Sequence, residues 1–190
     1  MTINLMSKII IGLAGKIASG KGTASDHIVK THNAVNYRYS DPLKEALGIF
    51  DIEATRQNLQ TFSTILRKNF SEDVLARAMF KRSKEAANDN VVIDGIRRII
   101  DFANFQLLDN FYLIYIEVDQ NIRYERYTKR DQSPGDATMS FNEFKEKDEA
   151  ESEQQVEKVK SKAHFTVNNN GSYEELRSQI DDIIQKLHES

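Results

Sequence analysis

A glycine-bearing segment near the start of this 190-residue chain constrains its fold more than any other feature. The segment reads Gly15-Lys16-Ile17-Ala18-Ser19-Gly20-Lys21-Gly22-Thr23. A short apolar run at 8–13 precedes it and indicates a buried strand, and residues 24–30 after it can form a helix. A strand, a glycine-bearing loop and a helix in this order bring backbone N–H groups around phosphate oxygens. The order therefore predicts a phosphate-binding loop, and the alternative is a glycine-rich turn without a ligand.

The residue types of this loop suit a polyphosphate and its metal ion. Glycines let the backbone bend tightly, and the start of the following helix directs unpaired N–H groups at the same oxygens. Lys21 can reach the outer phosphates. In the general pattern G-x-x-x-x-G-K-[S/T] the last position carries a hydroxyl, but here Gly22 stands there and Thr23 follows, so we assign the magnesium-side hydroxyl to Thr23. The loop residues expected to bind nucleotide are Gly15, Ala18, Ser19, Gly20, Lys21, Gly22 and Thr23.

The composition narrows the class of protein. Hydrophobic residues make up 39% of the chain and charged residues 29%, as expected for one soluble domain. A net charge of −3 gives no sign of a nucleic-acid or membrane surface. Cysteine is absent, so disulfides and thiolate metal sites are excluded, and the four histidines show no paired ligand spacing. With no leader and no apolar run of membrane-spanning length, we expect a cytoplasmic protein.

Strand and helix patterns alternate along the whole chain. Several of the strands are apolar on both faces, which is typical of a parallel sheet covered on both sides. We therefore predict an α/β fold with a five-stranded parallel sheet, helices on both faces and ligands at the carboxyl ends of the strands. One long charged helix is expected over 140–162, with its acidic run at 143–157 forming a solvated face. The expected strands lie at 8–13, 34–39, 91–94, 111–118 and 163–167.

Asp94 ends the apolar strand 91–94 and is the natural partner of the phosphate-binding loop. A carboxylate in this position can orient magnesium or a water bound to it. The alternative role is to cap the next helix.

Arg97 and Arg98 follow, and their planar guanidinium groups suit bidentate contacts to phosphate oxygens. Two cations at a helix start are otherwise mildly unfavourable, so we favour a phosphate-binding role over a solvated pair.

A basic helix is predicted at 119–130, before a loop at 131–138. Arg126 and Arg130 lie four residues apart and share one face, where like charges repel unless an anion lies between them. A basic helix that leads into a Ser-Pro-Gly-Asp loop is typical of a lid that delivers arginines to a reacting phosphate. A solvated basic face is the alternative.

Two further residues are candidates for binding the molecule that accepts the phosphate. Asp41 can cap a helix or bind a hydroxyl, and Arg67 could hold a phosphate.

Several segments resemble the nucleoside-monophosphate-kinase-like branch of the P-loop proteins. The run Gly20-Lys21-Gly22-Thr23 resembles that of adenylate kinase, although Ala18 and Arg97 replace a glycine and a proline of that enzyme. Residues 92–97 are similar to archaeal dephospho-CoA-kinase-like nucleotide kinases, and residues 39–44 resemble phage-type deoxynucleoside monophosphate kinases. Residues 163–172 resemble the last strand and turn of dephospho-CoA kinases. That turn lies against the adenine of ATP, which implies nucleotide contacts for Asn169 and Gly171.

The resemblance implies a single three-layer P-loop kinase domain with an acceptor-binding insertion at about 41–87 and a lid at about 123–140. It implies ATP with Mg²⁺ as donor and a (deoxy)nucleoside monophosphate as acceptor. We expect no nucleic-acid or membrane partner, on the grounds of the net charge, and a monomer or homodimer. Dephospho-CoA kinase and a non-enzymatic ATP-binding switch remain the alternatives. Thr23 and Asp94 would organise the metal, and Asp41, Arg67, Arg97 and Arg98 would bind the acceptor. The residues expected to carry catalysis are Lys21, Asp94, Arg97, Arg126 and Arg130.

Overall fold

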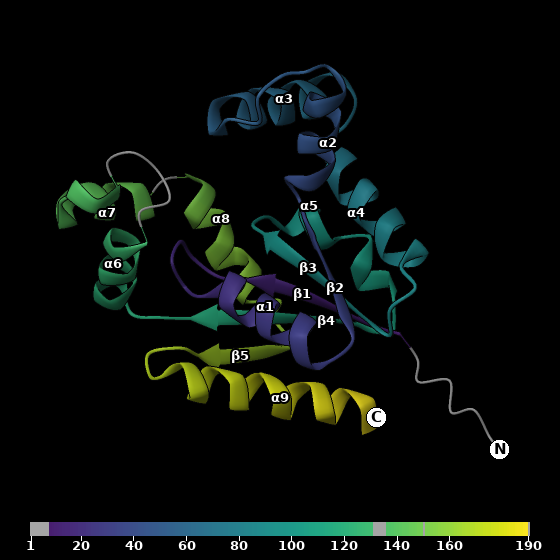
Figure 1. The fold of residues 1–190 in the computed structure, drawn as a ribbon, viewed down its shortest axis with the longest axis vertical. Coiled ribbons are helices and arrows are strands. Elements are labelled where there is room, and N and C mark those ends of the chain that lie inside the picture. Colours follow the sequence, from purple (N-terminus) through teal and green to yellow (C-terminus); the bar gives the residue numbers. More distant parts are fainter. Residues whose placement is uncertain (1–7, 131–135, 150, 190) are drawn as a thin grey trace.

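One parallel sheet of five strands, in the order β2-β3-β1-β4-β5, forms the centre of the molecule (Figure 1). The computed structural model describes residues 8–130, 136–149 and 151–189. The fold class predicted from the alternation of strands and helices is confirmed. The strands are β1 (Ile9–Ala14), β2 (Ala34–Arg38), β3 (Asn90–Ile96), β4 (Phe111–Glu117) and β5 (Phe165–Asn168).

Helices cover both faces of this sheet because successive strand residues point to opposite sides. In β1, Ile9 and Leu13 pack against α1 and α9, whereas Ile10 and Ala14 belong to the core shared with α4, α5 and α8. Every residue of β1 is buried, which explains its continuous apolar sequence. The helices are α1 (Lys21–Thr31), α2 (Asp41–Ile49), α3 (Arg56–Asn69), α4 (Val74–Glu85), α5 (Ile99–Phe102), α6 (Gln120–Lys129), α7 (Phe141–Asp148), α8 (Glu151–Lys160) and α9 (Tyr173–Glu189), with short 3-10 helices η1 (Phe105–Leu107) and η2 (Asp136–Thr138).

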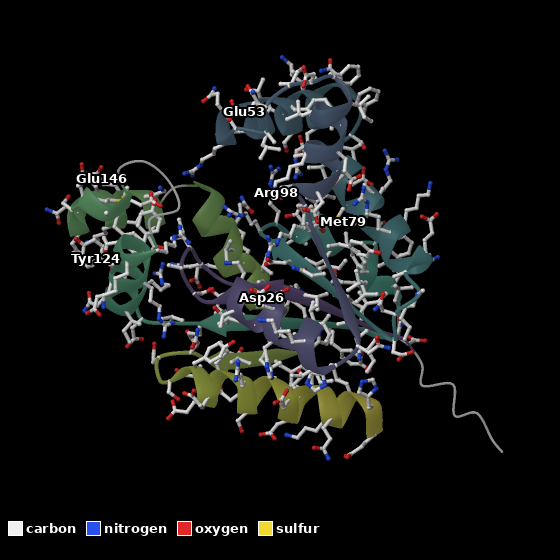
Figure 2. All side chains as sticks on the ribbon, in the orientation of Figure 1. Asp26, Glu53, Met79, Arg98, Tyr124 and Glu146 are labelled. Atoms are coloured by element: carbon white, nitrogen blue, oxygen red, sulfur yellow. The ribbon has the colours of Figure 1, made fainter. Side chains whose placement is uncertain are left out.

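Two groups of helices project from the sheet and flank its carboxyl edge. The α2–α3 pair forms one projection and the α6–α7 pair forms the other (Figure 1). Tyr124 lies within the second projection, and Arg98 lies between the first projection and the sheet (Figure 2). The segment after β1, which carries the glycines, is thus placed at an edge with a separate helical arm on either side.

The single helix expected over 140–162 is instead two helices, α7 and α8. The apolar residues of α7 and those of α8 pack against different parts of the protein. Phe144 of α7 packs on Tyr124 and Tyr127 of α6, with ring centroids 5.6 and 5.3 Å apart, whereas Val156 and Val159 of α8 are buried against the sheet. One straight helix cannot bury Phe144 against α6 and also bury Val156 and Val159 against the sheet. The chain therefore forms two helices instead of one.

Two smaller features also follow from side-chain contacts. After β3 the chain forms only the short helices α5 and η1, and the carboxylate of Asp101 accepts the backbone N–H groups of Arg97 and Arg98 at the start of α5. A capping box starts the last helix, α9, since Ser172 and Glu175 each accept the other's backbone N–H. Among the described residues, no helix has both the length and the apolar character needed to cross a membrane.

Candidate active site

The loop between β1 and α1 can form only because glycine occupies two of its positions. Gly20 has φ +95°, and a Cβ there would lie 2.3 Å from Nδ2 of Asn169. At Gly15, with φ +151°, a Cβ would lie 2.6 Å from the carbonyl oxygen of Ile116. Side chains at both positions would therefore collide with fixed neighbours, and backbone strain would add to the cost.

Lys21 lies across this loop. Its Nζ donates to the carbonyl oxygens of Gly15, at 2.6 Å, and Lys16, at 3.0 Å. Lys21 is also the first residue of α1, so the unpaired N–H groups of that helix face the same place. The positive ammonium group and the helix start give the loop the electrostatic character of an anion site.

A cavity of about 760 Å³ opens over the loop, and we call it the loop cavity. It contains six of the seven loop residues predicted to bind nucleotide, namely all except Gly15. The arginines around it come from four parts of the fold, which are the end of β2, the start of α3, the segment after β3 and the end of α6. The lining residues are Ile17, Ala18, Ser19, Gly20, Lys21, Gly22, Thr23, Asp26, Arg38, Arg56, Asp94, Arg97, Arg126, Tyr127 and Arg130.

A second cavity of about 510 Å³ adjoins the first and lies under the α2–α3 projection. Lys21, Arg38, Asp94 and Arg97 line both cavities, so the two meet at the end of β3. The second cavity combines apolar and basic side chains. Its other lining residues are Tyr39, Ser40, Leu43, Leu59, Gln60, Ser63, Arg67, Leu75, Gly95, Arg98 and Asp101.

Asp94 lies where the two cavities meet, and its side chain is only 13% exposed. Burial raises the pKa of this carboxyl above its ordinary value, while the positive charges of Lys21, Arg38 and Arg97 oppose the rise. Nε of Arg38 lies 3.5 Å from Oδ2 of Asp94. Asp94 does not cap the next helix, since Asp101 takes that role. The carboxylate of Asp94 and the hydroxyl of Thr23 both line the loop cavity, and oxygen donors of this kind suit Mg²⁺.

A side chain that follows in the sequence, Asp101, holds the backbone of the two arginines after Asp94. Oδ2 of Asp101 accepts the N–H groups of Arg97 and Arg98, both at 3.0 Å. Asp101 also faces Arg67, whose Nη1 lies 3.6 Å from Oδ1, a contact longer than a hydrogen bond. Buried Asp101 thereby holds the backbone of Arg97 and Arg98 and places a negative charge near Arg67 at the second cavity.

Helix α6 brings two predicted arginines, Arg126 and Arg130, to the loop cavity. Burial lowers the pKa of Arg126, and its Nη1 is buried with no hydrogen-bond partner within the part of the chain that the structure describes. Arg130 lies over the ring of Tyr127, with Cζ 4.5 Å from the centroid. Of the predicted lid loop, residues 131–135 lie outside the described residues.

The acidic run at 143–157 was expected to form a solvated face, and this expectation is wrong for Asp148. Asp148 is 4% exposed and accepts hydrogen bonds from Arg123, which is 3% exposed. Periodicity placed both residues on charged helices, but it gave no sign that α6 and α7 fold back on each other. The buried pair follows from that packing.

The other predicted site residues lie apart from the two cavities. Asp41 starts α2, and its Oδ2 accepts the backbone N–H of Arg38 at 2.6 Å. Asn169 is buried behind the loop, and its Nδ2 donates to the carbonyl oxygen of Ser19 at 2.8 Å. Gly171 lines a separate surface hollow of about 480 Å³ beside α9.

Sequence reasoning missed Arg38, which lines both cavities. A signal was available, because Arg38 ends β2 and pairs in register with Asp94 at the end of the neighbouring parallel strand. Arg56 was also missed. It begins α3 and reaches the loop cavity from the projection on the far side, a placement that no local pattern reveals.

The sheet order, the loop after β1 and the helical arms together define a P-loop kinase fold. Solved structures with this fold include a shikimate kinase from Bacteroides thetaiotaomicron, with a TM-score of 0.63 and 15% identity over 94% of this chain and 98% of that chain. Another is a shikimate kinase from Acinetobacter baumannii in complex with shikimate, with a TM-score of 0.60 and 15% identity over 96% of this chain and 94% of that chain. At this identity the likeness concerns the fold alone.

The chain belongs to the AAA domain family, whose family model matches residues 11–157. Among curated proteins it is 31% identical to a UPF0200/UPF0201 protein of Archaeoglobus fulgidus over 94% of this chain. It spans about half, 55%, of the length of that relative. It is 27% identical to a UPF0200 protein of Methanocaldococcus jannaschii, over 94% of this chain and 90% of the relative.

Proposed function

We propose that the protein transfers the γ-phosphoryl group of ATP to a nucleotide-like acceptor, most favourably a (deoxy)nucleoside monophosphate. One observation carries the proposal: the loop cavity and the second cavity share Lys21, Asp94 and Arg97. A site that binds a polyphosphate alone needs only the first cavity. Two adjoining cavities with cations at their junction suit a donor and an acceptor that meet there.

On the donor side, residues 15–23 would hold the phosphates of ATP through backbone N–H groups and Lys21. The left-handed backbone at Gly20 and the position of Lys21 Nζ across the loop support this assignment. Thr23 and Asp94 would hold Mg²⁺, which when bound would neutralise charge on the transferred phosphoryl group. Asn169 would support the loop from behind, through its hydrogen bond to Ser19.

On the acceptor side, the insertion at about 41–87 would close over the second cavity. This cavity offers Arg67, Arg97 and Arg98 to a phosphate and the side chains of Leu59 and Leu75 to an apolar surface such as a base. Arginine suits phosphate because its planar fork makes two parallel hydrogen bonds. A monophosphate with an attached base combines both requirements.

The transfer itself would require positioning and charge stabilisation. An oxygen of the acceptor forms a bond to the γ-phosphorus, the bond from that phosphorus to the bridging oxygen breaks, and ADP leaves. Lys21, Arg97, Arg126 and Arg130 would stabilise the charge that spreads over the phosphoryl oxygens. The lid at about 123–140 would deliver the last two.

The test is ADP release measured by a coupled assay, with a panel of ribo- and deoxynucleoside monophosphates, dephospho-CoA and shikimate as acceptors. We expect a nucleoside monophosphate to stimulate release. Stimulation by dephospho-CoA instead would reassign the acceptor to a hydroxyl compound. Binding of ATP with slow hydrolysis that no acceptor stimulates would favour a switch and overturn the proposal.

Two variants of α1 test whether Lys21 is required for phosphoryl transfer. Lys21→Ala removes the ammonium group at the loop cavity and should lower turnover at least about a hundredfold. Lys30→Ala removes an exposed lysine on the same helix and should leave turnover unchanged. Near-normal turnover by a folded Lys21→Ala protein would contradict the mechanism.

A further inference from the structure

Two imidazole rings and one carboxylate converge at the interface of α1 and α9, away from both cavities. Nε2 of His27 lies 2.7 Å from Oδ1 of Asp181, and Nε2 of His32 lies 2.6 Å from the same oxygen. One potential ligand atom from each residue lies within 4.8 Å of the other two. Within the described ranges, no other group of three histidine, cysteine or acidic side chains meets this condition.

The spacing of the two histidines hid this cluster from sequence analysis. Residues five apart in a regular helix differ by roughly 140° about its axis, so they do not share a face. His32, however, is the C-cap of α1, with φ −126° and ψ 31°, and the chain leaves the helix there. The end of the helix is what allows the second ring to turn back toward Asp181.

The hydrogen bonds in this cluster require a proton on Nε2 of each ring, because a carboxylate oxygen only accepts. If both protons leave, each ring presents an Nε2 lone pair on the side that faces the carboxylate of Asp181. A divalent cation can take the place of the two protons. We propose that His27, His32 and Asp181 form a binding site for one divalent transition-metal ion of the Zn²⁺ class, with water as the remaining ligand.

The chemistry of the three ligands selects the metal. Two imidazole nitrogens favour Zn²⁺, Co²⁺ or Ni²⁺, whereas Mg²⁺ and Ca²⁺ require oxygen ligands. Ligand atoms around a tetrahedral Zn²⁺ lie roughly 3.3 Å apart, so the cluster would have to open by somewhat more than half an ångström. Asp181 can supply this movement because its side chain is 45% exposed, and the same exposure leaves a path for the ion and its water.

The role that follows is structural. His27 is almost fully buried and His32 is 21% exposed, so α1 presents its ligands in fixed positions while α9 closes the site from outside. Asn90, the first residue of β3, donates to the carbonyl oxygen of His32 at 2.5 Å and fixes the same end of α1. A bound ion would tie α1, the helix that carries Lys21, to the last helix of the described chain. The site does not depend on Thr23 or Asp94 and is separate from the proposed magnesium ligands.

The experiment uses the full chain, freed of any oligohistidine tag, stripped with EDTA and titrated with Zn²⁺ and with Co²⁺ as the spectroscopic probe at neutral pH. We expect one equivalent to bind, visible Co²⁺ bands typical of nitrogen and oxygen ligands, and a melting temperature higher by about 5–10 °C at saturation. His32→Gln and Asp181→Asn should each weaken binding at least about tenfold. His188→Gln is the matched control, and Asp94→Asn excludes binding at the loop cavity, so both should bind as the wild type does.

If either ligand variant fails to fold, a measurement on the wild type still tests whether the metal binds at this site. The imidazole ¹⁵N resonances of His27 and His32 should shift on addition of Zn²⁺, while those of His164 and His188 should not. Absence of stoichiometric binding, or equal binding by wild type and folded ligand variants, would overturn the proposal. The cluster would then be a hydrogen-bonded carboxylate between two histidines and nothing more.

Discussion

Arg123 of α6 donates to both carboxylate oxygens of Asp148 in α7, with Nη2 and Oδ2 2.7 Å apart, and both side chains are buried. The contacts of this pair extend to the loop between β1 and α1. Nη1 of Arg123 also donates to the carbonyl oxygen of Ile17 at 3.4 Å, and Nζ of Lys16 lies 3.8 Å from Oδ2 of Asp148. The helical arm that carries Arg126 and Arg130 is therefore joined to the loop by one buried ion pair.

Asp148→Asn should lower the free energy of unfolding by about 3–5 kcal/mol, because it leaves the buried guanidinium of Arg123 without a compensating charge. Urea denaturation monitored by circular dichroism measures the change. The control is Glu125→Gln, which removes an exposed charge 3.9 Å from Lys129 on the same helix and should cost less than about 1 kcal/mol. Similar small losses for both variants would contradict a structural role for the pair.

The same pair predicts a pH dependence. Burial by itself would raise the pKa of Asp148, but the hydrogen bonds and charge of Arg123, with Gln120 and Lys16, outweigh it and hold the pKa below its ordinary value. A depressed pKa stabilises the folded state at pH values above about 3.9, the value in the unfolded chain, and this contribution is lost as the pH falls toward the folded value. Unfolding measured from neutral to acid pH should show the wild type losing its advantage over Asp148→Asn below about pH 4. A constant difference between the two proteins would refute this assignment.

Gly20→Ala should lower the free energy of unfolding by about 1–3 kcal/mol and weaken binding of ATP. The new Cβ would lie 2.3 Å from Nδ2 of Asn169, and the φ of +95° is unfavourable for alanine. For stability, Gly22→Ala is a control two residues away, since apart from its chain neighbours and the backbone of its own helix no heavy atom lies within 4 Å of a Cβ there. Because Gly22 lies in α1, alanine should be neutral or stabilising by up to about 1 kcal/mol. Thermal melts of the two variants measure the contrast, and equal effects would show that the close approach to Asn169 is unimportant.

Arg126→Ala should separate activity from stability. If this guanidinium stabilises the transferred phosphoryl group, its loss should reduce kcat about a thousandfold. The unfolding free energy should stay within about 1 kcal/mol of the wild type or rise, because the variant removes a buried Nη1 that has no hydrogen-bond partner among the described residues. Steady-state kinetics and denaturation on the same samples provide both readouts. Lys129→Ala, on the exposed side of α6, serves as the control and should change neither. Loss of stability with unchanged kcat in Arg126→Ala would show that this arginine serves only the packing of the arm.

The sheet was predictable because its information is local. The buried runs at 8–13 and 91–94, together with the alternation of strand and helix, are sufficient to indicate a parallel sheet. The break between α7 and α8 was not predictable, since it depends on Phe144 packing against Tyr124 and Tyr127 rather than against the sheet. Periodicity describes one helix at a time and carries no information about which core receives each face.

The residues of the candidate site likewise include some that the sequence predicts and some that it does not. The loop residues and Asp94 follow from a motif and from a strand end, and the structure brings all of them except Gly15 into one cavity. Arg56 and the Arg123–Asp148 pair depend on how the two projections fold back toward the sheet, which no short segment encodes. His27 and His32 were missed because their meeting depends on where α1 ends.

The hydrogen bond from Asn169 to Ser19 joins residues that are 150 positions apart in the chain. During synthesis at 5–20 residues per second, roughly 8–30 s separate the appearance of the loop from the appearance of its support. The nascent protein therefore has its phosphate-binding sequence long before it has a rigid loop. If the loop binds nucleotide as proposed, this affinity should accordingly develop late, as one of the last properties acquired by the folding chain.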